Sequence, residues 1–191
     1  MPKRKDLLTM NKTIHDRVLW IVRTGVLLAL LVALQAITKP LGQLVTGSCV
    51  NAVLAIAALF SGLGSGIVIA VISPVLAFLL GIAPQPVTVP AIMVGNTVYV
   101  VLLALLYRDD IFRRLLAWAA AAAAKAALLY AIVKGLICGL LAPGLLSAGL
   151  LKEPMLTALP KTFSWMQLFT ALIGGALAML IVPLLKKAIK N

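Results

Sequence analysis

Two lysine side chains interrupt a long apolar stretch of this 191-residue chain, and they are the first candidates for chemistry. The stretch runs from Ile111 to Gly139 and contains six consecutive alanines before Lys125 and, nine residues later, Lys134. It is long enough to cross a bilayer as a helix, and an ammonium group in hydrocarbon costs several kcal/mol unless it gains a partner, a water-filled cavity or access to the interface. All five acidic residues fall in predicted tails or loops: Asp6, Asp16, Asp109, Asp110 and Glu153. We therefore expect the counter-ion of an inward-facing lysine to be an anionic ligand.

The two lysines lie at different depths and on different faces of the predicted helix. Lys125 comes twelve residues after Arg113, about 18 Å along the helix axis and just past the membrane midplane. Nine residues at about 100° each place Lys134 on the opposite face, where it shares a side with Tyr130, so we do not expect both lysines to serve one site. A structural role is open for each: Lys134 would extend to the interface, and Lys125 would pair with helix carbonyls or bound water.

Amide and aromatic side chains at similar depth extend the candidate site. Asn96 lies near the start of the fourth apolar segment, Trp165 and Gln167 open the last one, and Gln85 lies in a proline-rich loop. Such groups suit a mainly apolar pocket with a few directing polar side chains. The alternative is an aromatic belt position for Trp165 and hydrogen bonds between helices for Asn96 and Asn51. The predicted substrate contacts are Lys134, Tyr130, Asn96, Lys125, Gln85, Trp165 and Gln167.

The composition of this chain lies outside the range of soluble globular proteins and is typical of an integral membrane protein. It is 63% hydrophobic and 12% charged, with a mean hydropathy of +1.13. We predict an all-α fold with one membrane domain, residues 18–185, between basic tails at residues 1–17 and 186–191. Its six transmembrane helices are expected at residues 18–38, 44–60, 66–81, 91–107, 112–137 and 163–185.

Positive charge gathers on one side of this predicted bundle. The two tails, the start of the first helix and the turn between the fourth and fifth helices carry most of the lysines and arginines, whereas the opposite side has only Lys39, Lys152 and Lys161. The positive-inside rule therefore places both termini in the cytoplasm. We expect the helices to lie in a prokaryotic plasma membrane. Topology and anionic lipid headgroups account for the net charge of +12, so no nucleic-acid partner is required.

The residue types argue against an enzyme. The single histidine, His15, lies in the predicted N-terminal tail, and no predicted span contains a carboxylate, so the usual intramembrane acid–base and proteolytic sites are excluded. There is no Walker A sequence for ATP hydrolysis. Cys49 and Cys138 lie apart in apolar context, which gives no support to a metal site, and we expect no bound cofactor.

A small-xxx-small spacing in the first helix, Ala29 to Ala33, allows another helix to approach closely. With six spans, cytoplasmic termini, long outward connections and no energising motif, the chain resembles the substrate-binding S component of an energy-coupling factor (ECF) vitamin transporter. The resemblance implies that Ala29 and Ala33 dock on a transmembrane T component, which works with two ATPase subunits. It also implies that a vitamin binds between the outer halves of helices four to six, and that the S component topples in the membrane to deliver it.

The embedded lysines favour a small carboxylate vitamin as the substrate. Pantothenate is the leading candidate, ahead of nicotinate, lipoate and biotin. Two other functions are open at this point: a non-transporting structural or assembly protein, and an autonomous facilitator that needs no ATPase.

Overall fold

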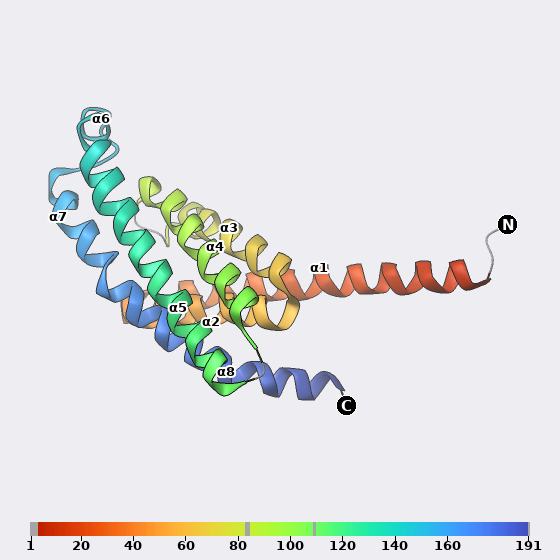
Figure 1. The fold of residues 1–191 in the computed structure, drawn as a ribbon. Coiled ribbons are helices and arrows are strands. Elements are labelled where there is room, and N and C mark those ends of the chain that lie inside the picture. Colours follow the sequence, from red (N-terminus) through yellow and green to blue (C-terminus); the bar gives the residue numbers. More distant parts are fainter. Residues whose placement is uncertain (1–3, 83–84, 109, 191) are drawn as a thin grey trace.

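The computed structural model describes residues 4–82, 85–108 and 110–190, and this part of the chain is helical without strands (Figure 1). The α-helices are α1 (Arg4–Thr38), α2 (Gln43–Ile56), α3 (Leu63–Leu79), α4 (Val89–Leu106), α5 (Ile111–Tyr130), α6 (Ala142–Ser147), α7 (Glu153–Thr162) and α8 (Trp165–Lys190). Two π-helical segments, Ala57–Ser61 and Ala131–Leu140, continue α2 and α5, and 3-10 turns occupy Lys39–Leu41 and Pro86–Thr88.

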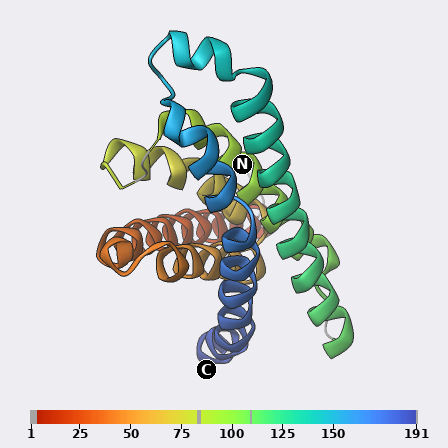
Figure 2. The same cartoon turned by 90° about the vertical axis from the view of Figure 1, so that its left-hand side faces the viewer.

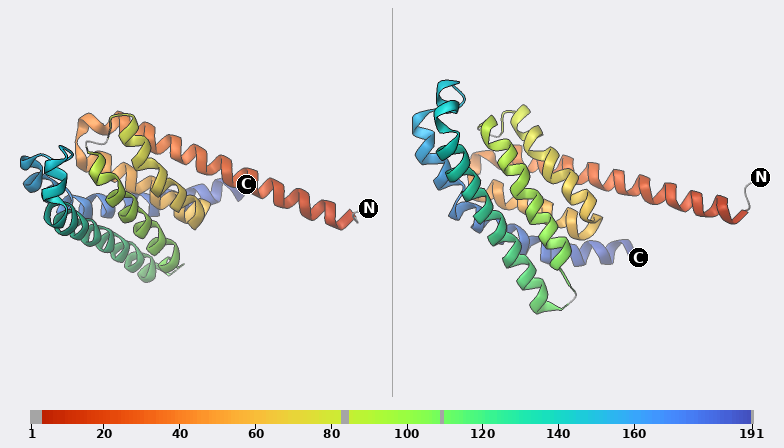
Figure 3. Two further views of the ribbon diagram at one scale, coloured as in Figure 1. Left: turned by 90° about the horizontal axis from the view of Figure 1, so that it is seen from above. Right: turned by 45° about the horizontal axis from the view of Figure 1, so that its top comes forward.

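The described helices confirm a bundle with about six membrane spans. Five helical segments are long and apolar enough to cross a bilayer: Ile14–Leu41, Gln43–Ser61, Pro86–Leu106, Ile111–Leu140 and Glu153–Ile189. The sixth, Leu63–Leu79, is apolar but has only 17 residues. The N-terminal part of α1 and the C-terminal part of α8 lie at one end of the bundle, opposite α6 and α7, as an even number of spans requires (Figures 1 and 3).

The six long helices form a closed ring of packed neighbours in the order α1, α2, α8, α5, α4 and α3, with α3 returning to α1. Figure 2 shows α5 and α8 side by side, with α1 and α2 crossing them at a steep angle. In lipid such contacts depend on close packing more than on removal of apolar surface from water. The ring therefore surrounds an interior to which every long helix contributes a face.

Two apolar clusters fill this interior and leave a polar layer between them. The cluster that includes Leu54, Tyr99 and Ala122 is called the inner cluster. The cluster nearer α6 and α7, which includes Leu129 and Phe163, is called the outer cluster. On α5, a buried lysine follows Ala122 and precedes Leu129. The layer between the clusters is where the candidate site lies.

Gly174 allows a close approach in the ring, between α8 and α2. A Cβ atom at this position would lie 2.6 Å from both the Cβ of Asn51 and the backbone nitrogen of Ala52. Only glycine leaves room for this contact, because real Cβ atoms do not come so close to other heavy atoms. The spacing of α2 and α8, and with it the position of Asn51, depends on this residue.

Two segments are more helical than the sequence indicates. α1 begins at Arg4, so most of the predicted tail at residues 1–17 continues the first helix instead of preceding it. Most of the connection between the fifth and sixth predicted helices, residues 138–162, is also helical and contains α6 and α7. Pro143 and Pro154 lie in the first turns of these helices, where a missing backbone N–H is harmless, so they start helices instead of breaking them.

Candidate functional site

A cavity of about 190 Å³ lies in the polar layer between the two apolar clusters. Residues from all six long helices and from α7 line it, which makes it a feature of the whole ring. Its polar lining residues are Gln35, Gln43, Thr46, Asn51, Thr88, Asn96, Lys125, Thr162 and Gln167. One of these residues is a cation and none is a carboxylate.

The ammonium group of Lys125 is held by two side-chain amides. Its Nζ donates to Oδ1 of Asn51 at 2.5 Å and to Oδ1 of Asn96 at 2.7 Å, and the lysine is only 2% exposed. These bonds reduce the cost of burying the charge, but amides are neutral and do not cancel it. Lys125 therefore has two side-chain amides as partners, in place of the helix carbonyls or bound water considered from the sequence, and no carboxylate is among the described residues that line the cavity.

Asn51 is committed to this arrangement by its other hydrogen bonds. Its Nδ2 donates to the carbonyl of Gly47 at 2.8 Å and to Oγ1 of Thr170 at 3.2 Å, so its oxygen must face Lys125. Thr170 in turn donates to the backbone carbonyl of Gln167 at 3.2 Å. Asn51 thus has no hydrogen-bonding capacity left on its amino group and serves to hold the ammonium in place.

Asn96 and Gln35 retain unused hydrogen-bonding groups in the described part of the protein. The amino group of Asn96 is buried without a partner, and so is the side-chain oxygen of Gln35. An unpaired buried polar group costs about 1–3 kcal/mol, so both groups require a ligand or water. The cavity therefore offers donors from Lys125 and Asn96 and an acceptor from Gln35.

Tyr99 limits the site on the side of the inner cluster. The Nζ of Lys125 lies 5.3 Å from the centre of its ring, a cation–π distance, and its hydroxyl donates to the carbonyl of Ala171 at 3.2 Å. The ring is fully buried. The ammonium is consequently held between an aromatic face and two amide oxygens.

The structure brings three of the seven predicted contacts, Asn96, Lys125 and Gln167, to this cavity. Gln85 is not among the residues that line the cavity. Its backbone carbonyl accepts a 2.9 Å hydrogen bond from Thr88, and Thr88 does line the cavity. It supports the cavity wall through its main chain.

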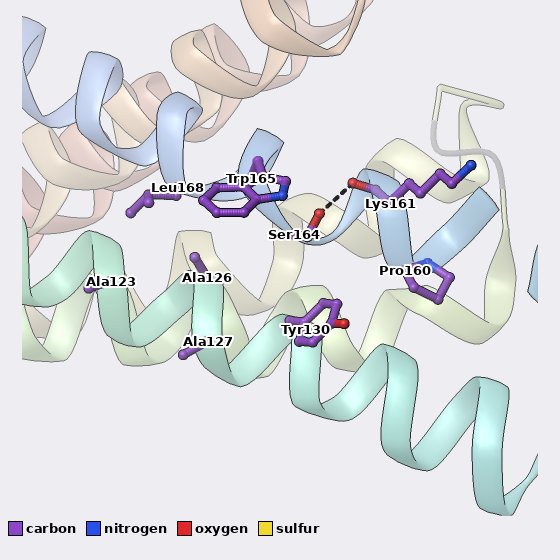
Figure 4. A pocket seen from close by; sticks show the side chains of 9 residues that line it. All are labelled: Ala123, Ala126, Ala127, Tyr130, Pro160, Lys161, Ser164, Trp165 and Leu168. Atoms are coloured by element: carbon purple, nitrogen blue, oxygen red, sulfur yellow. Dashed lines mark hydrogen bonds between the residues drawn. The ribbon is translucent and has the colours of Figure 1, made fainter. Parts of the chain in front are cut away.

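The remaining predicted contacts, Lys134, Tyr130 and Trp165, are not brought together with Lys125. Lys134 is exposed and donates to the hydroxyl of Tyr130 at 2.8 Å, which confirms that these two side chains share a face. Tyr130 and Trp165 line a separate groove, between α5 and the junction of α7 with α8 (Figure 4). The opposite orientation of Lys125 and Lys134, predicted from helix geometry, is confirmed by the burial of one and the exposure of the other.

Sequence reasoning did not assign Gln35, Gln43 or Thr88 to the site, and it treated Asn51 only as a link between helices. An amide within an apolar helix is the signal that could have identified Gln35 and Asn51. Among the described residues, no group of three histidine, cysteine or acidic side chains is placed to hold a metal ion.

The fold and the cavity define a class: an integral membrane protein whose helices enclose a small polar space around one buried cation. The family model described as ECF transporter, substrate-specific component matches residues 20–186, most of the chain. The protein therefore belongs to the S components of ECF transporters, which confirms the resemblance drawn from its spans and small-residue spacing. No curated protein and no solved structure matches the chain.

Family membership settles the general role. S components are the substrate-binding subunits of transporters and are not enzymes, and they work with the T component and ATPases of an ECF module. This supports a transport role over a purely structural one.

Proposed function

We propose that this S component binds a small anionic solute in the Lys125 cavity and delivers it inward on an ATP-driven partner module. The observation that carries the proposal is the buried ammonium of Lys125, which donates to the neutral side chains of Asn51 and Asn96. A bound carboxylate would supply the missing negative charge. Charge-assisted hydrogen bonds to a carboxylate are also stronger than bonds between neutral groups.

The unpaired groups narrow the chemistry of the solute. A carboxylate can accept from Lys125 and from the free amino group of Asn96, and a hydroxyl or amide N–H of the same molecule can donate to Gln35. A small molecule with an acid at one end and hydroxyl or amide groups further along fits this pattern. Pantothenate has that arrangement and is our leading candidate, with nicotinate, lipoate and biotin as further candidates.

A shallow groove on α1 supports docking of the T component. Ala29 and Ala33 lie in it, with Gly25 and Ala36, and its volume is about 470 Å³. Small side chains on a lipid-facing helix allow a partner helix to approach closely. We propose that this face binds the T component, that two ATPases complete the module, and that the S component topples in the membrane during delivery.

Mass spectrometry of small molecules retained by the purified protein is the direct test. We expect a carboxylate-containing compound, and titration calorimetry should then show tight binding of pantothenate but weak binding of the analogue in which an alcohol replaces its carboxylate. Retention of a neutral compound, or equal affinity for acid and alcohol, would contradict the anionic assignment. A different retained acid would keep the charge argument and replace pantothenate.

A further inference from the structure

A second, larger concavity lies on the outer surface of the bundle, on the other side of the α7–α8 junction from the cavity. This α5–α8 groove has a volume of about 540 Å³. Ala123, Ala126 and Ala127 of α5 line one side, and Trp165 and Leu168 line the other (Figure 4). The groove is lined mainly by apolar side chains and is open at the surface of the bundle, which suits a flexible hydrocarbon chain.

Polar and cationic side chains extend toward one end of the groove. In Figure 4 the amine of Lys161 and the hydroxyl of Tyr130 both point toward the end where α5 continues into its π-helical segment. The exposed Lys134 adds a second amine there, because its Nζ donates to that hydroxyl at 2.8 Å. The residues that line the groove include no carboxylate, so this end has a net positive charge.

We propose that the α5–α8 groove binds an anionic phospholipid. One acyl chain lies along the alanines of α5, and the phosphate lies at Lys161 and Lys134. Charge complementarity selects this occupant, because each lysine near a membrane surface attracts an anionic headgroup, whereas a neutral headgroup gains nothing from two cations. Trp165, which is 74% exposed, and Tyr130 are amphipathic rings suited to the level between chain and headgroup.

The groove is distinct from the substrate cavity. Lys125, Asn51 and Asn96 line the cavity and not the groove, and the α7–α8 junction lies between the two spaces. The groove faces outward along α5, toward the bilayer. The proposed lipid site is therefore separate from the proposed solute site.

Native mass spectrometry of the full chain released from nanodiscs tests this assignment. The nanodiscs hold equal amounts of phosphatidylglycerol and phosphatidylcholine with identical acyl chains. We expect phosphatidylglycerol to be retained in excess, Lys161→Gln to lower that excess about five-fold, and Ala127→Phe, which fills the groove, to abolish retention of both lipids. Both positions are exposed, so neither change disturbs the core.

Matched variants lie nearby. Ala119→Phe changes an exposed alanine of the same helix outside the groove, and Lys152→Gln removes an exposed lysine outside it. Both should retain lipid as the unmodified protein does. Equal retention of the two lipids, or retention unaffected by Ala127→Phe, would overturn the proposal. So would a dimer that Ala127→Phe dissociates, because it would assign the groove to a second copy of the chain.

Discussion

The Nζ of Lys125 lies 2.7 Å from the amide oxygen of Asn96, while the amino group of that same amide is buried without a partner in the described part of the protein. One asparagine thus steadies the cation and offers a further donor beside it. A bound anion would supply both the negative charge that Lys125 lacks and the hydrogen-bond acceptor that the amino group of Asn96 lacks. Removing either residue should affect acid binding more than it affects folding.

Lys125→Met keeps the length and apolar stem of the side chain but removes its charge. We expect the affinity for the carboxylate substrate to fall by about 1–3 kcal/mol, which is about five-fold to 150-fold. Thermal stability should change little, because the variant no longer buries a charge but leaves the amide oxygens of Asn51 and Asn96 without their donor. Titration calorimetry and thermal unfolding in detergent measure the two effects.

Lys152→Met is the control for this change, since Lys152 is exposed and lies outside the cavity. Lys134→Met decides between the two embedded lysines and should leave affinity close to that of the unmodified protein. Normal affinity in Lys125→Met with loss in Lys134→Met would return the assignment to Lys134.

Asn96→Asp gives the ammonium of Lys125 a resident carboxylate. We expect binding of the acid to fall at least as much as in Lys125→Met, because the site then already holds a negative charge and repels a second one. Binding of the neutral alcohol analogue should change much less. Competition between the two compounds in one binding assay measures this ratio, and a parallel loss of both would show that the substitution simply damages the cavity.

Gly174→Ala tests the contact between α8 and α2. The added Cβ would lie 2.6 Å from the Cβ of Asn51, so we expect the helices to separate and the protein to lose about 1–3 kcal/mol of stability. Substrate affinity should fall as well, because Asn51 holds Lys125. Gly135→Ala is the matched control, since nothing lies within 4 Å of its new Cβ. Equal melting temperatures for the two variants would contradict this packing argument.

Ala29→Trp and Ala33→Trp place a large ring in the small-residue groove of α1. We expect both to prevent co-purification of the T component and ATP-driven uptake, while substrate binding by the isolated protein is retained. Val26→Trp adds the same ring at an exposed position of α1 outside that groove and should leave assembly intact. Undiminished co-purification of both alanine variants would place the partner on another face.

Proteoliposomes that contain the protein alone distinguish a subunit from a facilitator. We expect substrate binding without accumulation inside the vesicles, and uptake only after the T component, the ATPases and ATP are added. Uptake by the protein alone, at the same rate with or without ATP, would establish the facilitator instead.

The sequence was sufficient for the number of spans and for the placement of Lys125 and Lys134 on opposite faces of one helix. Both follow from features that act within one helix: the length of an apolar run and the angle between successive residues. The same reasoning placed Lys134 and Tyr130 on one face. It could not decide which face meets the bundle and which meets lipid, because that depends on neighbouring helices.

The amides around Lys125 were harder to foresee. Asn51 and Asn96 lie 74 and 29 positions from it in the sequence, and they converge only because α2, α4 and α5 are packed in one ring. The close approach at Gly174 that sets part of this packing is invisible in a single sequence. Likewise, the sequence placed no helix between the fifth and sixth predicted spans, although two prolines there start helices.

The chain from Leu159 to Leu168 forms a wall between the cavity and the α5–α8 groove. Leu159, Phe163 and Gln167 line the cavity, whereas Ser164 and Leu168 line the α5–α8 groove. A shift of this wall in either direction enlarges one compartment at the expense of the other. The proposed solute site and the proposed lipid site therefore share one wall.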